Sequence, residues 1–143
     1  MKFLIAVAVI LGGCATVQPP APVSEPVPAP APAAQTGTAA VASLVTSARA
    51  DAAAGRLVQA AASLERALRI EPRNPHLWQE LARVRMKQGD YAQVESVAAR
   101  SNSWAGSDHR LRAENWRLIA QAREARGDAA GARAALEAAD RQR

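Results

Sequence analysis

Residues that could perform catalysis or hold a metal ion are few in this sequence and widely separated. The two histidines, His76 and His109, are far apart along the chain, and the single cysteine, Cys14, is distant from both. No carboxylates accompany either histidine at the spacing of a metal-binding motif, so we interpret both as surface residues. The motifs GxSxG and HExxH and the Gly-rich phosphate loop are absent. We therefore expect no enzyme activity, no metal and no cofactor other than a group attached to Cys14.

Cys14 directly follows a segment that is typical of a secretory leader. Lys2 supplies a positive charge, and the apolar run over residues 3–13 is well short of the roughly 20 residues that a membrane-spanning helix needs. The tetrapeptide Leu11-Gly12-Gly13-Cys14 resembles the lipobox of bacterial lipoproteins, in which the cysteine thiol receives a diacylglyceryl group and a peptidase cuts just before it. The resemblance implies a signal peptide over residues 1–13 and a covalent lipid on Cys14. The alternative is an ordinary leader with an incidental cysteine.

A lipid on this cysteine implies a membrane anchor. Each buried methylene of an acyl chain contributes about 0.8 kcal/mol, and more than one chain is needed for stable attachment. The resemblance implies that the mature cysteine carries three such chains, palmitate among them. In bacteria with two membranes the following residue influences sorting, and Ala15 is not the aspartate associated with retention in the inner membrane. We therefore expect an outer-membrane lipoprotein that faces the periplasm.

Residues 14–40 form a linker in our interpretation. Seven of the nine prolines lie between Pro19 and Pro32, and Glu25 is the only charged residue from position 18 to position 40. Alternating prolines remove amide donors and favour polyproline II, so we expect a disordered, Pro/Ala-rich spacer that rises about 3.1 Å per residue. The alternative is a ligand for a polyproline-binding partner, although the basic and aromatic residues that would give specificity are missing.

The remaining residues, 41–143, are enough for one small domain. Alanine supplies 36 residues, against five for Phe, Trp and Tyr together, so the apolar area is limited and a deep catalytic pocket is excluded. The net charge is +5, but the arginines are dispersed among Asp and Glu at helical spacings, which is typical of a solvated face. Nucleic-acid binding requires a concentrated basic stripe, so we expect no nucleic-acid partner.

Self-similarity at a nearly fixed offset is the strongest signal in this domain. Gly55, Gly89 and Gly127 recur at an interval within the range of about 20 to 50 residues that marks repeat proteins. Trp78 and Trp116 are separated by the same interval as Gly89 and Gly127, so each tryptophan stands equally far before its glycine. Apolar residues follow helical spacing, and no alternating run indicates a strand. The pattern predicts helical units with a glycine in the left-handed turn between two helices.

These units resemble the tetratricopeptide repeat, a helix-turn-helix motif of about 34 residues. The run from Leu64 to Pro75 is a particularly close match. Repeat one then covers residues 41–74, repeat two covers residues 75–108, and repeat three begins near Ala113. The resemblance implies an all-α array of about three repeats, which is close to the minimum for units that bury their surface only against neighbours.

The sequence departs from the repeat pattern at a few positions. Arg56 replaces the usual aspartate, Ser101 replaces the usual alanine, and four extra residues around 101–110 are interpreted as an inserted linker. The two tryptophans that share the repeat offset fall at packing positions and are interpreted as core. Trp104, inside the insertion, is either a plug on the convex surface or a contact for a partner.

In this repeat family the first helix of each unit, helix A, lines a groove that binds extended peptides. Transferred repeat by repeat, the polar groove positions are Arg49, His76, Gln79, Arg83, Lys87, Glu114, Arg117, Gln121 and Glu124. Arg49, Arg83 and Arg117 follow one another at equal intervals of one repeat length and form a basic line, so a peptide with acidic groups or a free carboxylate would suit the groove. We expect this groove, and not the convex face, to carry the function.

The resemblance implies a membrane-anchored periplasmic scaffold that mediates protein–protein interaction in envelope assembly. Two alternatives stay open: a non-catalytic accessory subunit or activator of an envelope enzyme, for instance one that remodels peptidoglycan, and a self-associating structural module. Repeat arrays usually end in an additional polar helix, which is not expected here. We therefore expect a homodimer or a docked partner helix at the C-terminal helix, on a face formed by Ala129, Ala132, Leu136 and Ala139.

Overall fold

The structure, a computed structural model, describes residues 32–142, with side chains from residue 37 onward. Over this range the chain forms α-helices and no strand. The bounds are Pro32–Ala53 for α1, Leu57–Ile70 for α2, Pro75–Gln88 for α3, Tyr91–Trp104 for α4, His109–Ala125 for α5 and Ala129–Asp140 for α6. The predicted signal peptide, the lipid acceptor Cys14 and the linker up to residue 31 lie outside the described residues.

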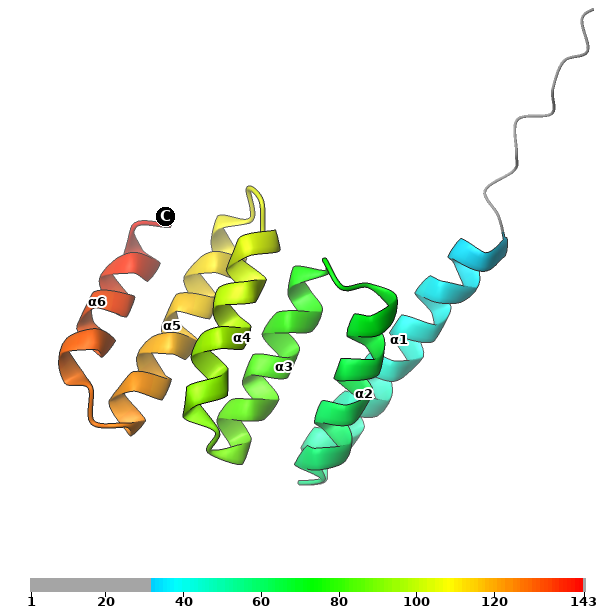
Figure 1. The fold of residues 1–143 in the computed structure, drawn as a ribbon, viewed down its shortest axis with the longest axis horizontal. Helices are drawn as coiled ribbons and strands as arrows, with labels where there is room; N and C mark the ends of the chain where they lie inside the picture. Colours follow the sequence, from blue (N-terminus) through cyan, green and yellow to red (C-terminus); the bar gives the residue numbers. More distant parts are fainter. Residues whose placement is uncertain (1–31, 143) are drawn as a thin grey trace, which may run out of the picture.

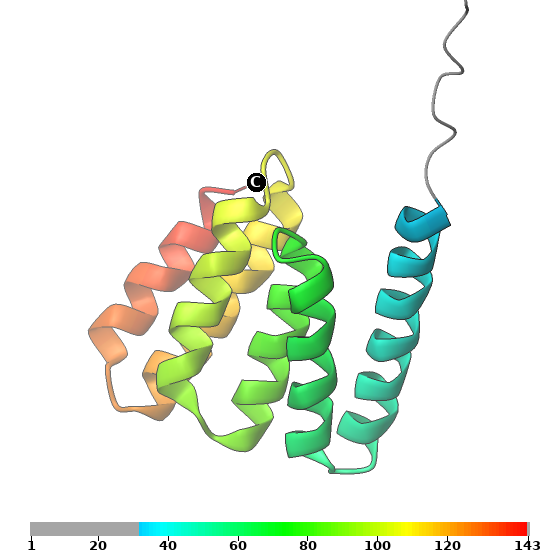
Figure 2. The ribbon, with the colours of Figure 1, turned by 45° about the vertical axis from the view of Figure 1, so that its right-hand side comes forward.

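The helices stand side by side in chain order as antiparallel pairs, α1 with α2, α3 with α4 and α5 with α6 (Figure 1). Packing of α2 against α3 and of α4 against α5 joins successive pairs, and α3 also touches α5. Figure 2 shows the pairs stacked in one row, with α1 at one end and α6 at the other. The predicted all-α array of about three helix pairs is confirmed.

Small side chains allow these helices to approach one another closely. The larger core joins α1, α2 and α3 through Val41, Ala48, Ala60, Ala61, Leu64, Ala67, Leu68, Leu77, Leu81 and Val84. A second core joins α3 to α6 through Ala82, Ala98, Ile119, Ala120 and Ala135. Trp78 packs against the first core and Trp116 against the second, and both are half-buried. The packing role predicted for these two tryptophans therefore holds, with part of each side chain left at the surface.

A glycine in the left-handed conformation follows the first helix of every pair, as the repeat spacing predicts. The backbone angle φ is +76° at Gly55, +77° at Gly89 and +82° at Gly127. Residues with a Cβ atom rarely adopt this region, because the Cβ approaches the following carbonyl oxygen. These glycines therefore reverse the chain at little cost and set the antiparallel pairing.

An aspartate side chain caps the N-terminus of three of the helices. Asp90, Asp108 and Asp128 each accept a hydrogen bond from the backbone N–H three residues later, at 3.3, 2.9 and 2.8 Å respectively. Such a cap satisfies one of the N–H groups that a helix start leaves without a partner. Arg56 occupies the corresponding place before α2, makes no capping bond, and forms an ion pair of 2.7 Å with Asp51 instead.

Helix α1 begins earlier than the sequence interpretation allows. It starts at Pro32, so residues 32–40, which we assigned to the linker, are helical. Pro32 is the only proline in α1, and it stands at the first position, where a missing N–H costs nothing and the fixed φ suits the helix. Alanine, the best helix former, is frequent in the rest of this segment. In Figure 1 the first turns of α1 project beyond the end of α2.

Three of the four extra residues of repeat three lengthen its first helix, and the fourth lies in the turn after it, which spans residues 126–128 where the turn of repeat two spans residues 89–90. The connection between α2 and α3 spans residues 71–74, and the connection between α4 and α5, residues 105–108, has the same length. In contrast, α3 has 14 residues and α5 has 17. The inserted linker expected over residues 101–110 is therefore wrong. Three added residues are close to one helical turn of 3.6 residues, so the packing face of α5 nearly keeps its direction and the array can accept the insertion.

The face expected to be free on the last helix is only partly so. Ala132 and Ala139 are buried, because they belong to the face of α6 that packs against α5. Leu136 is 48% exposed and Ala129 is exposed, so these two residues are what remains of the expected apolar edge.

Of the helices formed by residues 32–142, none is both long enough and apolar enough to span a membrane.

Candidate functional site

The first helices of the three pairs enclose a hollow of about 480 Å³. We call it the helix-A groove, and its walls are Arg49, His76, Gln79, Glu80, Arg83, Asp108, Arg110, Leu111 and Glu114. All of these residues belong to α1, α3 or α5, apart from Asp108, which caps the start of α5. The groove is therefore built from successive repeats, as the repeat resemblance implies.

Five of the residues predicted for a partner site line the helix-A groove. His76, Gln79 and Arg83 come from α3, where spacings of three and four residues place side chains on one helix face. Arg49 reaches the groove from α1, and Glu114 reaches it from α5. The groove positions transferred to the first two turns of α3 therefore line one hollow with Arg49 and Glu114, and their role in binding a partner stays a prediction.

Four groove residues were missed by the sequence interpretation. Asp108, Arg110 and Leu111 lie in or beside the added turn of α5, which we had interpreted as a linker and left out of the repeat. An unbroken helical assignment from residue 109 would have found them. Glu80 occupies a repeat position beside the groove positions; it lines the groove and forms an ion pair with Arg49 there.

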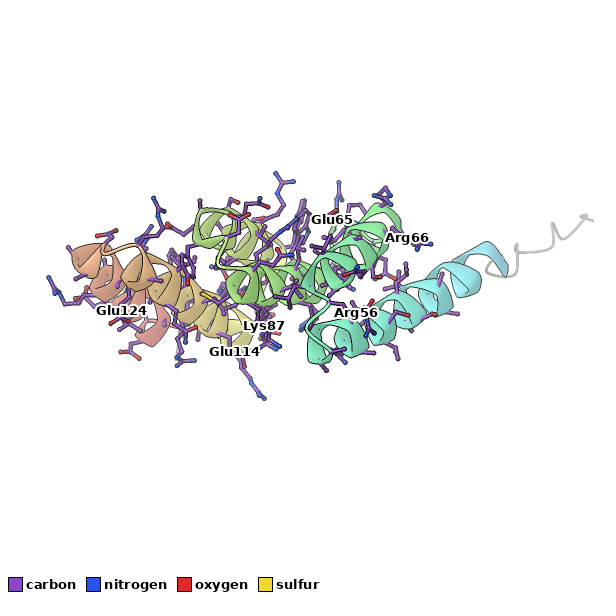
Figure 3. All side chains as sticks on the ribbon, turned by 90° about the horizontal axis from the view of Figure 1, so that it is seen from below. Arg56, Glu65, Arg66, Lys87, Glu114 and Glu124 are labelled. Carbon is purple, nitrogen blue, oxygen red and sulfur yellow. The ribbon has the colours of Figure 1, made fainter. Side chains whose placement is uncertain are left out.

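The other predicted residues lie outside the hollow. Lys87, Arg117, Gln121 and Glu124 are found on later turns of α3 and α5 and do not line it. Figure 3 shows Lys87, Glu114 and Glu124 along one long edge of the array, whereas Glu65 and Arg66 of α2 lie along the opposite edge. Lys87 and Glu124 therefore lie on the same side of the array as Glu114 but outside the hollow.

The groove arginines are engaged with carboxylates from neighbouring helices. Arg49 Nη2 of α1 lies 2.7 Å from Glu80 Oε1 of α3. Arg83 Nη2 of α3 lies 3.0 Å from Glu114 Oε2 of α5, and Arg110 Nε lies 3.2 Å from the other oxygen of that carboxylate. Gln79 Nε2 also donates a hydrogen bond of 3.2 Å to Glu114. Each bond except the one from Arg110 joins two successive repeats.

This pairing corrects the basic line that the equal spacing of three arginines indicated. Arg49 and Arg83 face carboxylates, and Arg117 stands outside the hollow. The wall contains three arginines and three acidic residues, so their formal charges cancel. An acidic partner segment would have to compete with Glu80 and Glu114 for their arginines. Exposed ion pairs contribute only about 0 to 1 kcal/mol each, so such an exchange costs little.

The groove has the chemistry of a recognition surface. His109 is exposed, with Nδ1 2.9 Å from Arg112 Nη2, and His76 stands at the groove wall. In the part of the chain that the structure covers, no three side chains of the His, Cys, Asp or Glu type gather as a metal site. What the groove offers is hydrogen-bond donors and acceptors in a fixed arrangement across three repeats, which suits an extended segment of another protein.

Trp104 is not the buried plug that one interpretation of the sequence favoured. It is the last residue of α4 and is 44% exposed. The guanidinium carbon of Arg73 lies 5.2 Å from the centroid of its ring system. The same arrangement occurs at Trp78, where the guanidinium carbon of Arg100 is 5.2 Å from the ring centroid. Two stacked Arg–Trp pairs thus stand at the surface, away from the helix-A groove.

Comparisons with known proteins agree with this architecture. The model of the tetratricopeptide repeat family matches residues 51–113. Among solved structures, the globular C-terminal domain of P. aeruginosa LpoP is 50% identical, with a TM-score of 0.68 and with 70% of this chain and 94% of that domain covered. A search of curated proteins gave no significant match. The chain therefore belongs to the tetratricopeptide-repeat family, and the C-terminal domain of LpoP is one of its relatives.

Proposed function

We propose that the protein is a non-catalytic scaffold of the bacterial envelope that binds another protein through its helix-A groove. A lipid on Cys14 anchors it to the outer membrane, and the repeat array faces the periplasm. The observation that carries the proposal is the groove itself, whose walls come from three successive repeats and present polar side chains to solvent. The leader and lipobox-like residues before the array support the anchor.

The paired charges refine the partner that we propose. Arg49 and Arg83 accept acidic groups only by exchange with Glu80 and Glu114, and those two carboxylates are then free for basic groups. A segment with charges of both signs therefore fits better than a purely acidic one. Proteins that bind the C-terminal domain of LpoP are the first partners to test, because half of the residues are identical over the matched region.

Crosslinking in envelopes, followed by purification and mass spectrometry, tests the proposal. We expect Arg83→Glu combined with Arg110→Glu to lose the partner that the native protein captures, because both changes place a carboxylate beside Glu114. The matched control is Arg133→Glu combined with Arg141→Glu, which changes the net charge equally on exposed residues at and just after α6. Retention of the partner by the groove variant, or its loss from the control, would contradict the proposal.

The accessory-subunit alternative makes the same binding prediction and one more. If the partner is an envelope enzyme, adding the native chain should change the rate of that enzyme, and the groove variant should not. If the activity of the captured enzyme does not change, the scaffold function is favoured over the accessory subunit. If crosslinking captures only further copies of this chain, the self-associating module is favoured.

A further inference from the structure

A second hollow, of about 500 Å³, lies between α2 and α4 with α3 as its floor. We call it the α2–α4 groove, and it is lined by Glu65, Leu68, Arg69, Pro72, Trp78, Leu81, Arg85, Gln93, Val97 and Arg100. Glu65 of this groove and Glu114 of the helix-A groove lie on opposite edges of the array in Figure 3. The two grooves are therefore separate surfaces, and no residue lines both.

The floor of the α2–α4 groove is apolar. Leu68 and Leu81 close it from below and are buried, and Val97 and Trp78 are half-buried at its sides. The indole Nε1 of Trp78 donates a hydrogen bond of 2.8 Å to the carbonyl oxygen of Pro72. This bond fixes the indole and satisfies its only donor, so the ring presents an apolar surface to whatever enters.

The rim of the same groove is basic. Among the described residues, Arg69 on α2 and Arg100 on α4 form no ion pair with a carboxylate, and Arg100 stacks over Trp78. Glu65, the one acidic residue of the lining, is already bound by Arg85 at 2.6 Å. The Nε of Arg85 is buried without an acceptor. Trp104 follows Arg100 by four residues, which makes the two neighbours on the surface of α4, and it carries the second stacked arginine, Arg73.

The basic excess that the sequence pattern placed in the helix-A groove is found instead in the α2–α4 groove, for which the sequence made no prediction. In the helix-A groove arginines and acidic residues balance, whereas in the α2–α4 groove three arginines face a single glutamate. An apolar floor with an excess of positive charge at its rim is complementary to an apolar side chain flanked by carboxylates.

We propose that the α2–α4 groove docks an acidic segment of a partner protein that inserts one aromatic or aliphatic side chain. The apolar side chain lies over Leu68 and Leu81 against Trp78, and the carboxylates on either side of it meet Arg69 and Arg100. A membrane surface fits less well, because the apolar floor is recessed between two helices. The chain's own proline-rich segment fits less well because its one carboxylate is Glu25. This surface goes beyond the proposed function and depends on neither the helix-A groove nor the anchor.

A synthetic peptide with defined chemistry tests this inference. The probe is a short peptide of aspartate, glutamate and serine with one central phenylalanine, and it is titrated into the full chain in mild detergent. Indole N–H signals in NMR spectra report binding at the tryptophans. We expect the signals of Trp78 and Trp104 to shift, while that of Trp116 stays in place. Control peptides replace the phenylalanine by serine, or every acidic residue by lysine, and we expect neither to shift the signals.

Variants separate the groove from general charge attraction. Arg69→Glu combined with Arg100→Glu should weaken peptide binding by at least about tenfold, because both rim cations become anions. Arg133→Glu with Arg141→Glu, the same charge change elsewhere, should bind as the native chain does. Arg83→Glu with Arg110→Glu should also bind the peptide as the native chain does. The test of the α2–α4 groove is therefore independent of the test of the helix-A groove, and a failure of one proposal can be told from a failure of the other. Circular dichroism and a thermal melt confirm that each variant is folded.

Three results would overturn the inference. The first is an unchanged spectrum with the acidic peptide, or equal binding by the rim variant and the native chain. The second is a shift of the Trp78 and Trp104 signals by vesicles with anionic headgroups and not by the peptide, which would make the surface a membrane contact. The third is that deletion of residues 18–31 alone shifts these signals, which would show that the chain's own segment fills the groove.

Discussion

Arg83 of α3 and Glu114 of α5 face each other across two repeats, with Nη2 and Oε2 3.0 Å apart. The same carboxylate also accepts from Gln79 and Arg110. We expect Glu114→Ala to lower the free energy of unfolding by about 1 kcal/mol, because three donors lose a charged acceptor that is only partly exposed. Urea denaturation measures the change. The control is Glu124→Ala on a later turn of the same helix, for which we expect less than about 0.5 kcal/mol; equal losses would contradict the prediction.

The aspartate caps give a second expectation. Replacing Asp128 by alanine should destabilise the protein by about 1 kcal/mol, because the N–H of Gly131 loses its acceptor at the start of α6. Asp128→Asn should restore most of the loss, since asparagine caps almost equally well. At the corresponding place before α2, Arg56 makes no capping bond, so Arg56→Ala should cost clearly less. Thermal melts of the three variants decide, and an equal cost for Arg56→Ala would rule out capping as the cause.

The third expectation concerns a buried polar contact at the junction of repeats two and three. Ser101 and Asn115 are fully buried, and Asn115 Nδ2 donates to Ser101 Oγ at 2.7 Å. Ser101 Oγ in turn donates to the carbonyl oxygen of Pro75 at 2.8 Å. Ser101→Ala restores the residue usual for the repeat, yet it should cost about 1 to 3 kcal/mol, because the buried Nδ2 of Asn115 loses one of its two acceptors and the carbonyl of Pro75 loses a donor.

The double variant separates this explanation from a simple size effect. Asn115 Nδ2 also donates to Asn102 Oδ1 at 2.9 Å, so Ser101→Ala removes one of its two acceptors. Adding Asn115→Leu removes this amide and keeps a similar volume, so stability should recover in part. Urea denaturation of both single variants and the double variant gives the coupling energy. Strictly additive losses would show that the two side chains act independently.

The anchor gives the fourth expectation. Cys14→Ser should release the protein from the membrane fraction or leave an uncleaved precursor, because a hydroxyl in place of the thiol does not receive the lipid. Fractionation and electrophoretic migration of the native and variant chains measure this. A variant that fractionates and migrates like the native chain would show that Cys14 carries no anchor.

The helical array was largely predictable because its determinants are local. Each turn needs a glycine where φ is positive, and the spacing of Gly55, Gly89 and Gly127 therefore located the helix pairs in advance. The start of α1 was not predictable in the same way, since the proline-rich composition before residue 32 masked the alanine-rich run after it. The added turn in α5 was also hidden, because an insertion of close to one turn leaves the apolar spacing on either side nearly unchanged.

The candidate site was only half predictable because its chemistry depends on pairs of helices. The repeat pattern places Arg49 and Arg83 on the correct face, but it contains no information on which carboxylate a long side chain reaches. The basic excess around Trp78 was missed for the same reason. Arg69 and Arg100 are distant in the sequence and meet at one rim only when α2 and α4 stand on either side of α3.

The packing of helix α1 also determines which part of the array would separate first if the N-terminal end of the chain were pulled. The chain enters the domain through α1, which packs mainly against α2 and reaches α3 through the ion pair of Arg49 with Glu80. Units of a repeat array are held only by their neighbours, so a pull on the first helix is resisted by its packing against α2, by the core it shares with α2 and α3, and by that ion pair. A force transmitted from a membrane tether would therefore peel α1 from α2 before it disturbed the pairs α3 with α4 and α5 with α6. Under such a load we expect the first repeat to open before the two repeats behind it lose their shape.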